Sequence, residues 1–130
     1  MIVLDTHAWV WWNSDPTKLS AAARTAIEEA DQLCVSPISC WEVSMLVAKG
    51  RLGLDRDVRT WVREALAEEI VHLVPISAEI AVAAGALDNF HGDPADRLIV
   101  ATTLALSAIL VTKDGKIQDY ENRNGDTFAI

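Results

Sequence analysis

Short apolar runs alternate with helix-like segments along this chain, and this alternation is the feature that most limits its fold. Four such runs, each three or four residues long and typical of buried strands, are found at residues 1–4, 33–35, 72–74 and 109–111. Strands that alternate with helices form crossover units, which make the strands parallel and cover both faces of the sheet. We therefore predict an α/β fold with a central parallel β-sheet sandwiched by α-helices.

The helices are predicted from helix-forming residues and from residues that suit helix ends. They are expected at residues 6–12, 20–30, 39–48, 55–69, 78–86 and 94–107, with a last short strand at 128–130. Ser20, Ser77 and Asp93 are suitable N-terminal caps, and Pro94 suits the first position of a helix. Gly50 suits a left-handed cap at the end of the 39–48 helix.

The composition indicates a folded protein with a hydrophobic core. The chain has 130 residues, of which 51% are hydrophobic, so we expect a single domain over residues 1–130. No apolar run approaches the ~20 residues that cross a bilayer, and no secretory signal is recognisable, so we expect a cytoplasmic protein. Cys34 and Cys40 have no partners at metal-ligand spacing and are expected to be small buried thiols.

The charge is acidic but uneven. A net charge of −8 and a pI of about 4.7 argue against broad binding of nucleic acid through its phosphates. Five of the eleven basic residues nevertheless fall within fifteen positions: Lys49, Arg51, Arg56, Arg59 and Arg63. They form either a local basic surface or a solvated helix face, and the sequence leaves both interpretations open.

Four acidic residues stand where a predicted strand ends or a predicted helix begins: Asp5, Glu42, Asp96 and Asp114. Asp5 is the most informative, because it follows a buried strand, where a carboxylate is costly unless it is paired, hydrogen-bonded or bound to a metal. Ligands of such folds bind beyond the carboxyl ends of the strands. We therefore expect the four carboxylates to share one cleft, which a divalent cation would stabilise.

Each of these residues also has a structural alternative. Glu42 fits a capping box with Ser39, and Asp96 would meet the positive end of the helix that Asp93 caps. Asp114 precedes Gly115 in a pair typical of turns, and Asp5 can cap the next helix. The joint pattern favours a shared site, since four separate caps at one edge of a sheet would be a coincidence.

Magnesium and manganese prefer carboxylate oxygens, and phosphodiester hydrolysis uses them directly. Such a reaction needs no serine, cysteine or histidine nucleophile, and the scattered histidines do not suggest a triad. The hydroxyls of Thr6 and Thr112 could orient a water or a phosphate oxygen, or serve only as turn or cap groups. Arg97 could contact a substrate phosphate or form a structural ion pair.

Three closely spaced tryptophans add a further expectation. Trp9, Trp11 and Trp12 cannot all lie on one helix face, because residues one or two positions apart point in different directions. At least one of them is expected to be exposed or at an interface, where aromatic residues are enriched.

Four motifs in order resemble PIN-domain ribonucleases, specifically the VapC-type toxins of bacterial toxin–antitoxin pairs. They are Leu4-Asp5-Thr6-His7-Ala8, the segment 36–52 around Trp41-Glu42-Val43 and Lys49-Gly50-Arg51-Leu52, Asp93-Pro94-Ala95-Asp96-Arg97-Leu98-Ile99, and Leu110-Val111-Thr112-Lys113-Asp114. The order and spacing agree over nearly the whole chain.

This resemblance implies a PIN-like fold and an endoribonuclease that depends on Mg²⁺ or Mn²⁺. It implies that Asp5, Glu42, Asp96 and Asp114 form the catalytic, metal-binding quartet, with Asp5 and Asp96 as the principal ligands. It further implies an RNA substrate, a homodimer and a cognate antitoxin, through which alone operator DNA is bound. A DNA-directed nuclease of the same fold and a metal-free interaction module with an acidic cleft remain as alternatives.

Overall fold

The computed structural model describes residues 1–90, 92–124 and 129–130. Its strands are β1 (Ile2–Leu4), β2 (Leu33–Val35), β3 (Val71–Leu73) and β4 (Ile109–Val111). Its helices are α1 (Thr6–Ser14), α2 (Ala21–Glu29), α3 (Pro37–Ala48), α4 (Val58–Ala67), α5 (Ala78–Gly85), α6 (Pro94–Ala105) and α7 (Gly115–Asn124), with a short 3-10 turn at Pro16–Lys18. The predicted α/β architecture is confirmed.

The strands form one parallel sheet in the order β3-β2-β1-β4. The chain builds the sheet outward from β1 through β2 to β3, and then crosses back to place β4 on the other side of β1. The boundary between β1 and β4 is therefore the point where the strand order reverses. In open α/β sheets this is where a crevice forms beyond the carboxyl ends of the strands.

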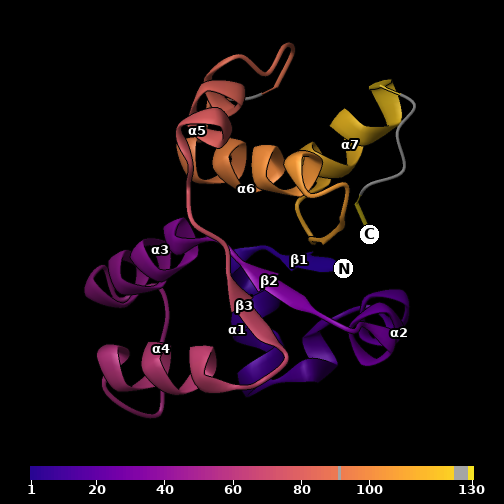
Figure 1. Cartoon of the computed structure of the whole chain (residues 1–130). Coiled ribbons are helices and arrows are strands. Elements are labelled where there is room, and N and C mark those ends of the chain that lie inside the picture. The colour runs from indigo at the N-terminus through magenta and orange to yellow at the C-terminus, as the bar shows by residue number, and fades with distance from the viewer. Residues whose placement is uncertain (91, 125–128) are drawn as a thin grey trace.

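Two layers of helices enclose the sheet, because alternate residues of each short strand face opposite sides. Leu4 of β1 and Val35 of β2 pack with α1, α2 and α4 on one face. Val3 and Cys34 pack with α6 and α7 on the other face, and α5 packs against α6. Figure 1 shows these two layers, with α5, α6 and α7 on one side of the sheet and α1, α2 and α4 on the other.

The predicted caps explain where several helices begin. Ser20, Ser77 and Asp93 accept hydrogen bonds from the backbone N–H groups of Ala23, Ile80 and Asp96, at 3.0, 3.1 and 3.1 Å. Gly50 has a φ of 70° and follows the end of α3, as predicted. The predicted helix 39–48 begins two residues earlier than expected, because Ser36 caps it and Pro37 occupies its first position.

Two other boundaries were predicted wrongly, and α7 (Gly115–Asn124) was not predicted. The helix expected at 55–69 begins at Val58, because Asp57 rather than Asp55 accepts hydrogen bonds from the first free N–H groups. The strand expected at 72–74 lies at Val71–Leu73. Of the strand expected at 128–130, residue 128 lies outside the described residues, while Ala129 forms an isolated parallel bridge with Leu110.

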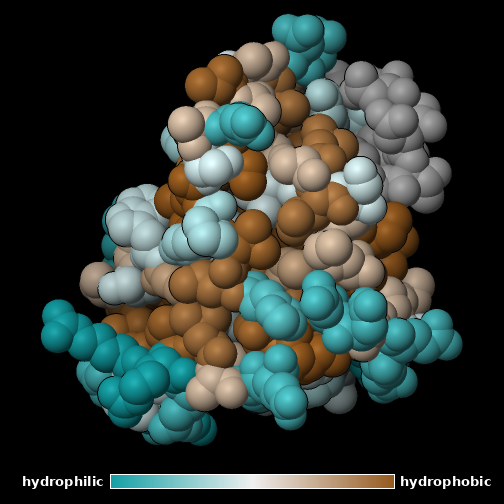
Figure 2. Space-filling model, viewed as in Figure 1, coloured by the Kyte–Doolittle hydropathy of each residue, from teal (hydrophilic) through white to brown (hydrophobic). Residues whose placement is uncertain are grey.

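The remaining expectations concern the surface and the thiols. Cys34 is buried, Cys40 is half-buried, and both are free. The basic cluster is exposed on the end of α3, on α4 and between them, where Arg56 pairs with Asp55 and Glu64. Hydrophilic residues gather at the corner of the molecule where α4 lies (Figure 2). Within the described ranges, no helix is long and apolar enough to cross a membrane.

Candidate active site

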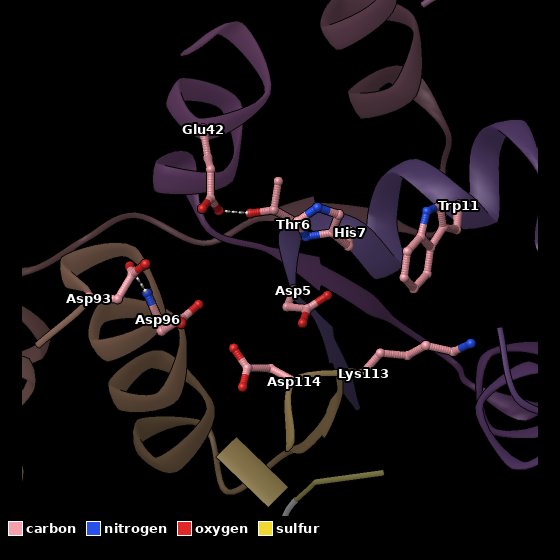
Figure 3. A pocket seen from close by; sticks show the side chains of 9 residues that line it. All are labelled: Asp5, Thr6, His7, Trp11, Glu42, Asp93, Asp96, Lys113 and Asp114. Atoms are coloured by element: carbon pink, nitrogen blue, oxygen red, sulfur yellow. Dashed lines mark hydrogen bonds between the residues drawn. The ribbon is translucent and has the colours of Figure 1, made fainter. Parts of the chain in front are cut away.

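A pocket of about 390 Å³ opens beyond the carboxyl ends of β1 and β4, at the reversal of strand order. It is lined by Asp5, Thr6, His7, Trp11, Glu42, Asp93, Asp96, Lys113 and Asp114. All four predicted carboxylates therefore lie in the same pocket. Figure 3 shows Asp5, Asp96 and Asp114 directed toward a common space, while Glu42 approaches from α3.

Asp5 combines two roles that the sequence had posed as alternatives. It directly follows β1 and caps α1, since one of its carboxylate oxygens accepts the Ala8 N–H at 2.8 Å. The Thr112 hydroxyl also donates to this carboxylate. Asp5 is nevertheless only 7% exposed, and burial raises its pKa above the usual 3.8, with the negative charge of Glu42 adding to the effect. The cap holds the side chain in place without removing it from the pocket.

Glu42 is held by a residue from another helix. The buried Thr6 hydroxyl donates to a carboxylate oxygen of Glu42 and also hydrogen-bonds with the buried Ser39 hydroxyl, at 3.0 Å between oxygens. The alternative capping box between Ser39 and Glu42 is wrong, because Ser36 caps α3 and Glu42 lies in its second turn. Glu42 is therefore oriented by a contact across the fold and not by its own helix end.

Asp96 lies in the first turn of α6, as predicted, and its backbone N–H donates to the capping side chain of Asp93. The pKa of Asp96 is raised to about 7. Burial is the largest cause, followed by the negative charges of Asp93, Asp114, Glu42 and Asp5. Asp96 is thus electrostatically coupled to every other carboxylate of the pocket, which is direct physical support for their convergence.

Asp114 is connected to Asp5 through Thr112. The Thr112 hydroxyl, 2% exposed, accepts the Asp114 N–H at 3.0 Å and donates to the Asp5 carboxylate. The Asp114 side chain accepts the Lys116 N–H at 2.8 Å at the start of α7. The predicted turn role of Asp114 therefore coexists with its place in the pocket, as the cap role does for Asp5.

The pocket fits a hydrated hard cation. Five carboxylates line it, and three helices, α1, α6 and α7, begin there. In the part of the chain that the structure describes, no three His, Cys, Asp or Glu side chains are grouped so that they could hold a metal ion directly. Magnesium keeps several of its waters and needs only one or two carboxylate ligands. The carboxylate oxygens fit such an ion, as do the burial and the mutual repulsion that together raise the pKa of Asp96.

Arg97 has a different place from the one considered for it. Its guanidinium donates to four backbone carbonyl oxygens, those of Ala84, Gly85, Leu87 and Phe90, at 2.9 to 3.2 Å. It does not line the pocket. These contacts give Arg97 a structural role: it fastens the end of α5 and the segment that follows it to the first turn of α6, next to Asp96.

Sequence reasoning missed four residues of this pocket: His7, Trp11, Asp93 and Lys113. Asp93 was interpreted only as a cap, and the histidines were considered only as too scattered for a triad. The spacing of His7 and Trp11, four positions apart on one helix, places them on the same face, and their rings lie 5.6 Å apart. The sequence therefore held a signal for Trp11: His7 is two positions from Asp5, and Trp11 lies on the same helix face as His7.

Comparison with known proteins gives a consistent result. The sequence model of the family described as PIN domain matches residues 2–122. Ribonuclease VapC22 of Mycobacterium tuberculosis is 42% identical over 122 residues, which cover 93% of this chain and 92% of that protein.

Two solved structures resemble the fold at low sequence identity. The first is VapBC2 from Rickettsia felis bound to a DNA fragment from its promoter, with a TM-score of 0.69, 18% identity, and coverage of 100% of this chain and 98% of that one. The second is a toxin–antitoxin complex from Klebsiella pneumoniae, with a TM-score of 0.64, 22% identity, and coverage of 89% and 88%. Together with the match over residues 2–122, the sheet topology and the acidic pocket establish that this chain belongs to the PIN domain family.

Proposed function

We propose that this protein is an endoribonuclease that depends on Mg²⁺ or Mn²⁺ and acts as the toxin of a toxin–antitoxin pair. The observation that carries the proposal is the convergence of Asp5, Glu42, Asp96 and Asp114 in one pocket at the reversal of strand order. The 42% identity to a protein named a ribonuclease, over almost the whole length of both chains, supports RNA as the substrate.

Asp5 and Asp96 are the proposed principal metal ligands, with Asp114 and Glu42 completing the site directly or through water. When bound, the cation would activate a water molecule and neutralise charge on the scissile phosphate. In its absence the crowded carboxylates hold a proton, since the pKa of Asp96 is about 7. Asp96 is therefore partly protonated near neutral pH, and a bound cation would displace that fraction of a proton.

Two threonine hydroxyls hold carboxylates of the site in place. Thr6 orients Glu42, and Thr112 ties Asp5 to the start of α7. The oxygen of water forms a bond to phosphorus while the P–O ester bond breaks, which leaves a phosphate on one RNA fragment and a hydroxyl on the other. No enzyme residue becomes covalently attached, so the site needs no side-chain nucleophile.

The proposal includes two protein partners, a cognate antitoxin and a second copy of the chain. The structural relatives named above are toxin–antitoxin complexes, one of them crystallised with promoter DNA. We propose that operator DNA is contacted through the antitoxin, because the net charge of −8 disfavours direct binding of this chain to a duplex.

The test is to incubate the purified chain, free of antitoxin, with total RNA in Mg²⁺ or Mn²⁺, with and without a chelator. An Asp96→Asn variant is compared with Asp119→Asn, a matched change at an exposed position of α7 outside the pocket. We expect discrete RNA fragments that require both the metal and Asp96 but not Asp119. Cleavage of DNA instead of RNA, or folded protein that neither cuts RNA nor binds the metal, would contradict the proposal.

A further inference from the structure

One edge of the acidic pocket carries an aromatic ring and a cation that the proposed metal chemistry does not use. Trp11 comes from α1 and Lys113 from the segment between β4 and α7, and both line the pocket. The Lys113 ammonium lies 5.4 Å from the centroid of the Trp11 ring, within the range of a cation–π contact. Figure 3 shows the two side chains together, on the side of the pocket away from Asp93 and Asp96.

The fold leaves this ring partly exposed, although a neighbouring tryptophan is buried. Trp9 is 0% exposed and stacks edge-on against Trp61 in the core, at 4.9 Å between centroids. Trp11 is only partly buried and lies beside the exposed His7. The three closely spaced tryptophans differ in burial, as expected of residues that cannot all lie on one helix face, but none of them is exposed: Trp11 and Trp12 are half-buried. The one that reaches the pocket is Trp11.

The charge of the pocket explains why a substrate needs such a contact. Among the described residues that line it, Lys113 is the sole lysine or arginine, against five carboxylates. An RNA phosphate approaching the pocket is therefore repelled wherever a metal does not neutralise it. Aromatic stacking of a base is insensitive to this repulsion, and a lysine beside the ring can attract the next phosphate.

We propose that Trp11 and Lys113 form a platform that binds an unpaired nucleotide beside the scissile phosphate. An unpaired base stacks on the Trp11 ring, and the Lys113 ammonium moves from the ring to the adjacent phosphate. The ammonium exchanges one attractive contact for another, which limits the cost of uncovering the ring. Bases within a duplex are already stacked, so the platform selects single-stranded or looped RNA. This inference rests on the proposed function, since it assigns a substrate class to the same pocket.

The experiment measures binding separately from cleavage. All proteins carry Asp96→Asn so that RNA is not cut, and the probes are fluorescein-labelled oligo(A) and oligo(U) of equal length, read by anisotropy. Trp11→Leu keeps an apolar side chain but removes the ring, whereas Trp11→Phe keeps a ring. Trp41→Leu is the matched control, because Trp41 is 57% exposed and lies outside the pocket. Thermal melts establish that each variant is folded.

We expect Trp11→Leu to weaken oligo(A) binding by about tenfold, the effect of losing one stacked base, and to abolish any preference for oligo(A) over oligo(U). Trp11→Phe should stay within about threefold of the parent, because a smaller ring still stacks. Lys113→Gln should lower the slope of log Kd against log salt by about 0.7, the value for one phosphate on a single strand. Trp41→Leu and Lys116→Gln should change neither quantity.

The outcomes separate this inference from the proposed function. Equal affinity of Trp11→Leu and Trp41→Leu would overturn the platform, as would no binding of either oligonucleotide by the parent protein. If Asp96-intact protein cuts RNA while Trp11→Leu binds it normally, the ribonuclease proposal stands and the platform is wrong. If binding depends on the ring but Asp96-intact protein cuts no RNA, the platform stands and the ribonuclease proposal is wrong.

Discussion

Removal of the charge at Asp96 should stabilise the metal-free protein while it abolishes the response to metal. Burial and four neighbouring carboxylates raise the pKa of Asp96 from 3.8 to about 7, so the folded state binds a proton there more tightly than the unfolded state. Stability therefore falls as the pH rises from about 4 to about 7, and stays at its lowered value above that range. Asparagine is nearly isosteric with the protonated carboxyl and does not ionise.

The size of the stabilisation by Asp96→Asn follows from the rise in the pKa of Asp96 and from the exposure of its side chain. A rise of the pKa from 3.8 to about 7 would correspond to about 4 kcal/mol if Asp96 were fully buried. Asp96 is partly exposed, and screening by solvent reduces this to about 1–2 kcal/mol. For a chain of this length, such a gain raises Tm by about 3–8 °C.

The assay is thermal and urea unfolding of the wild type, Asp96→Asn and Asp119→Asn in chelator, from about pH 4 to about pH 8. We expect Asp96→Asn to match the wild type near pH 4 and to exceed it above pH 7, and Asp119→Asn to match it throughout. Addition of Mg²⁺ should then raise the Tm of the wild type but not that of Asp96→Asn. The reasoning is refuted if Asp96→Asn is no more stable than the wild type at pH 8, or if its advantage does not change with pH.

Three further predictions concern other contacts of the site. Thr6→Val should reduce the rate of RNA cleavage about 10- to 100-fold, because Glu42 loses its hydrogen bond, and should lower the free energy of unfolding by about 1–3 kcal/mol. Thr6→Ser keeps the hydroxyl and should restore both quantities. Equal cleavage rates of the Thr6→Val and Thr6→Ser variants would contradict this role. The affinity for Mg²⁺, measured by calorimetry, should rise with pH up to about 7 because the cation displaces the Asp96 proton, and equal affinities at about pH 6 and pH 8 would argue against it. Arg97→Lys should lower the free energy of unfolding, measured in urea, by about 2 kcal/mol, because lysine cannot reproduce four hydrogen bonds to main-chain oxygens. Arg63→Lys, at an exposed position, is the control. An equal effect of the two substitutions would disprove the structural role of Arg97.

Local patterns in the sequence determined most of the elements and the ends of most helices, although α7 (Gly115–Asn124) was not predicted. Ser20, Ser77 and Asp93 cap helices through hydrogen bonds to N–H groups three residues away, so the information lies within one turn of chain. The start of α4 was predicted wrongly because it depends on which of two nearby acidic residues, Asp55 or Asp57, becomes the cap. The position of β3 was predicted wrongly because it depends on the pairing register with the neighbouring strand.

The convergence of the carboxylates was also predictable from sequence, because the carboxyl ends of parallel strands meet at one edge. What supports them was not. Thr6 and Glu42 are 36 positions apart, and Lys113 meets Trp11 across 102 positions, so no local rule links them. Arg97 is adjacent to Asp96 in sequence, yet its guanidinium donates to carbonyl groups at the end of α5 and in the segment after it, and does not line the pocket.

The sequence by itself determined the alternation of strands and helices, most of the caps, and the four acidic residues of the pocket, since periodicity and turn chemistry act over a few residues. The tertiary structure decided the sheet order, the hydroxyls that orient Glu42 and Asp5, the elevated pKa of Asp96 and the pairing of Trp11 with Lys113. These features depend on burial and on contacts between distant segments, which exist only after the chain has folded.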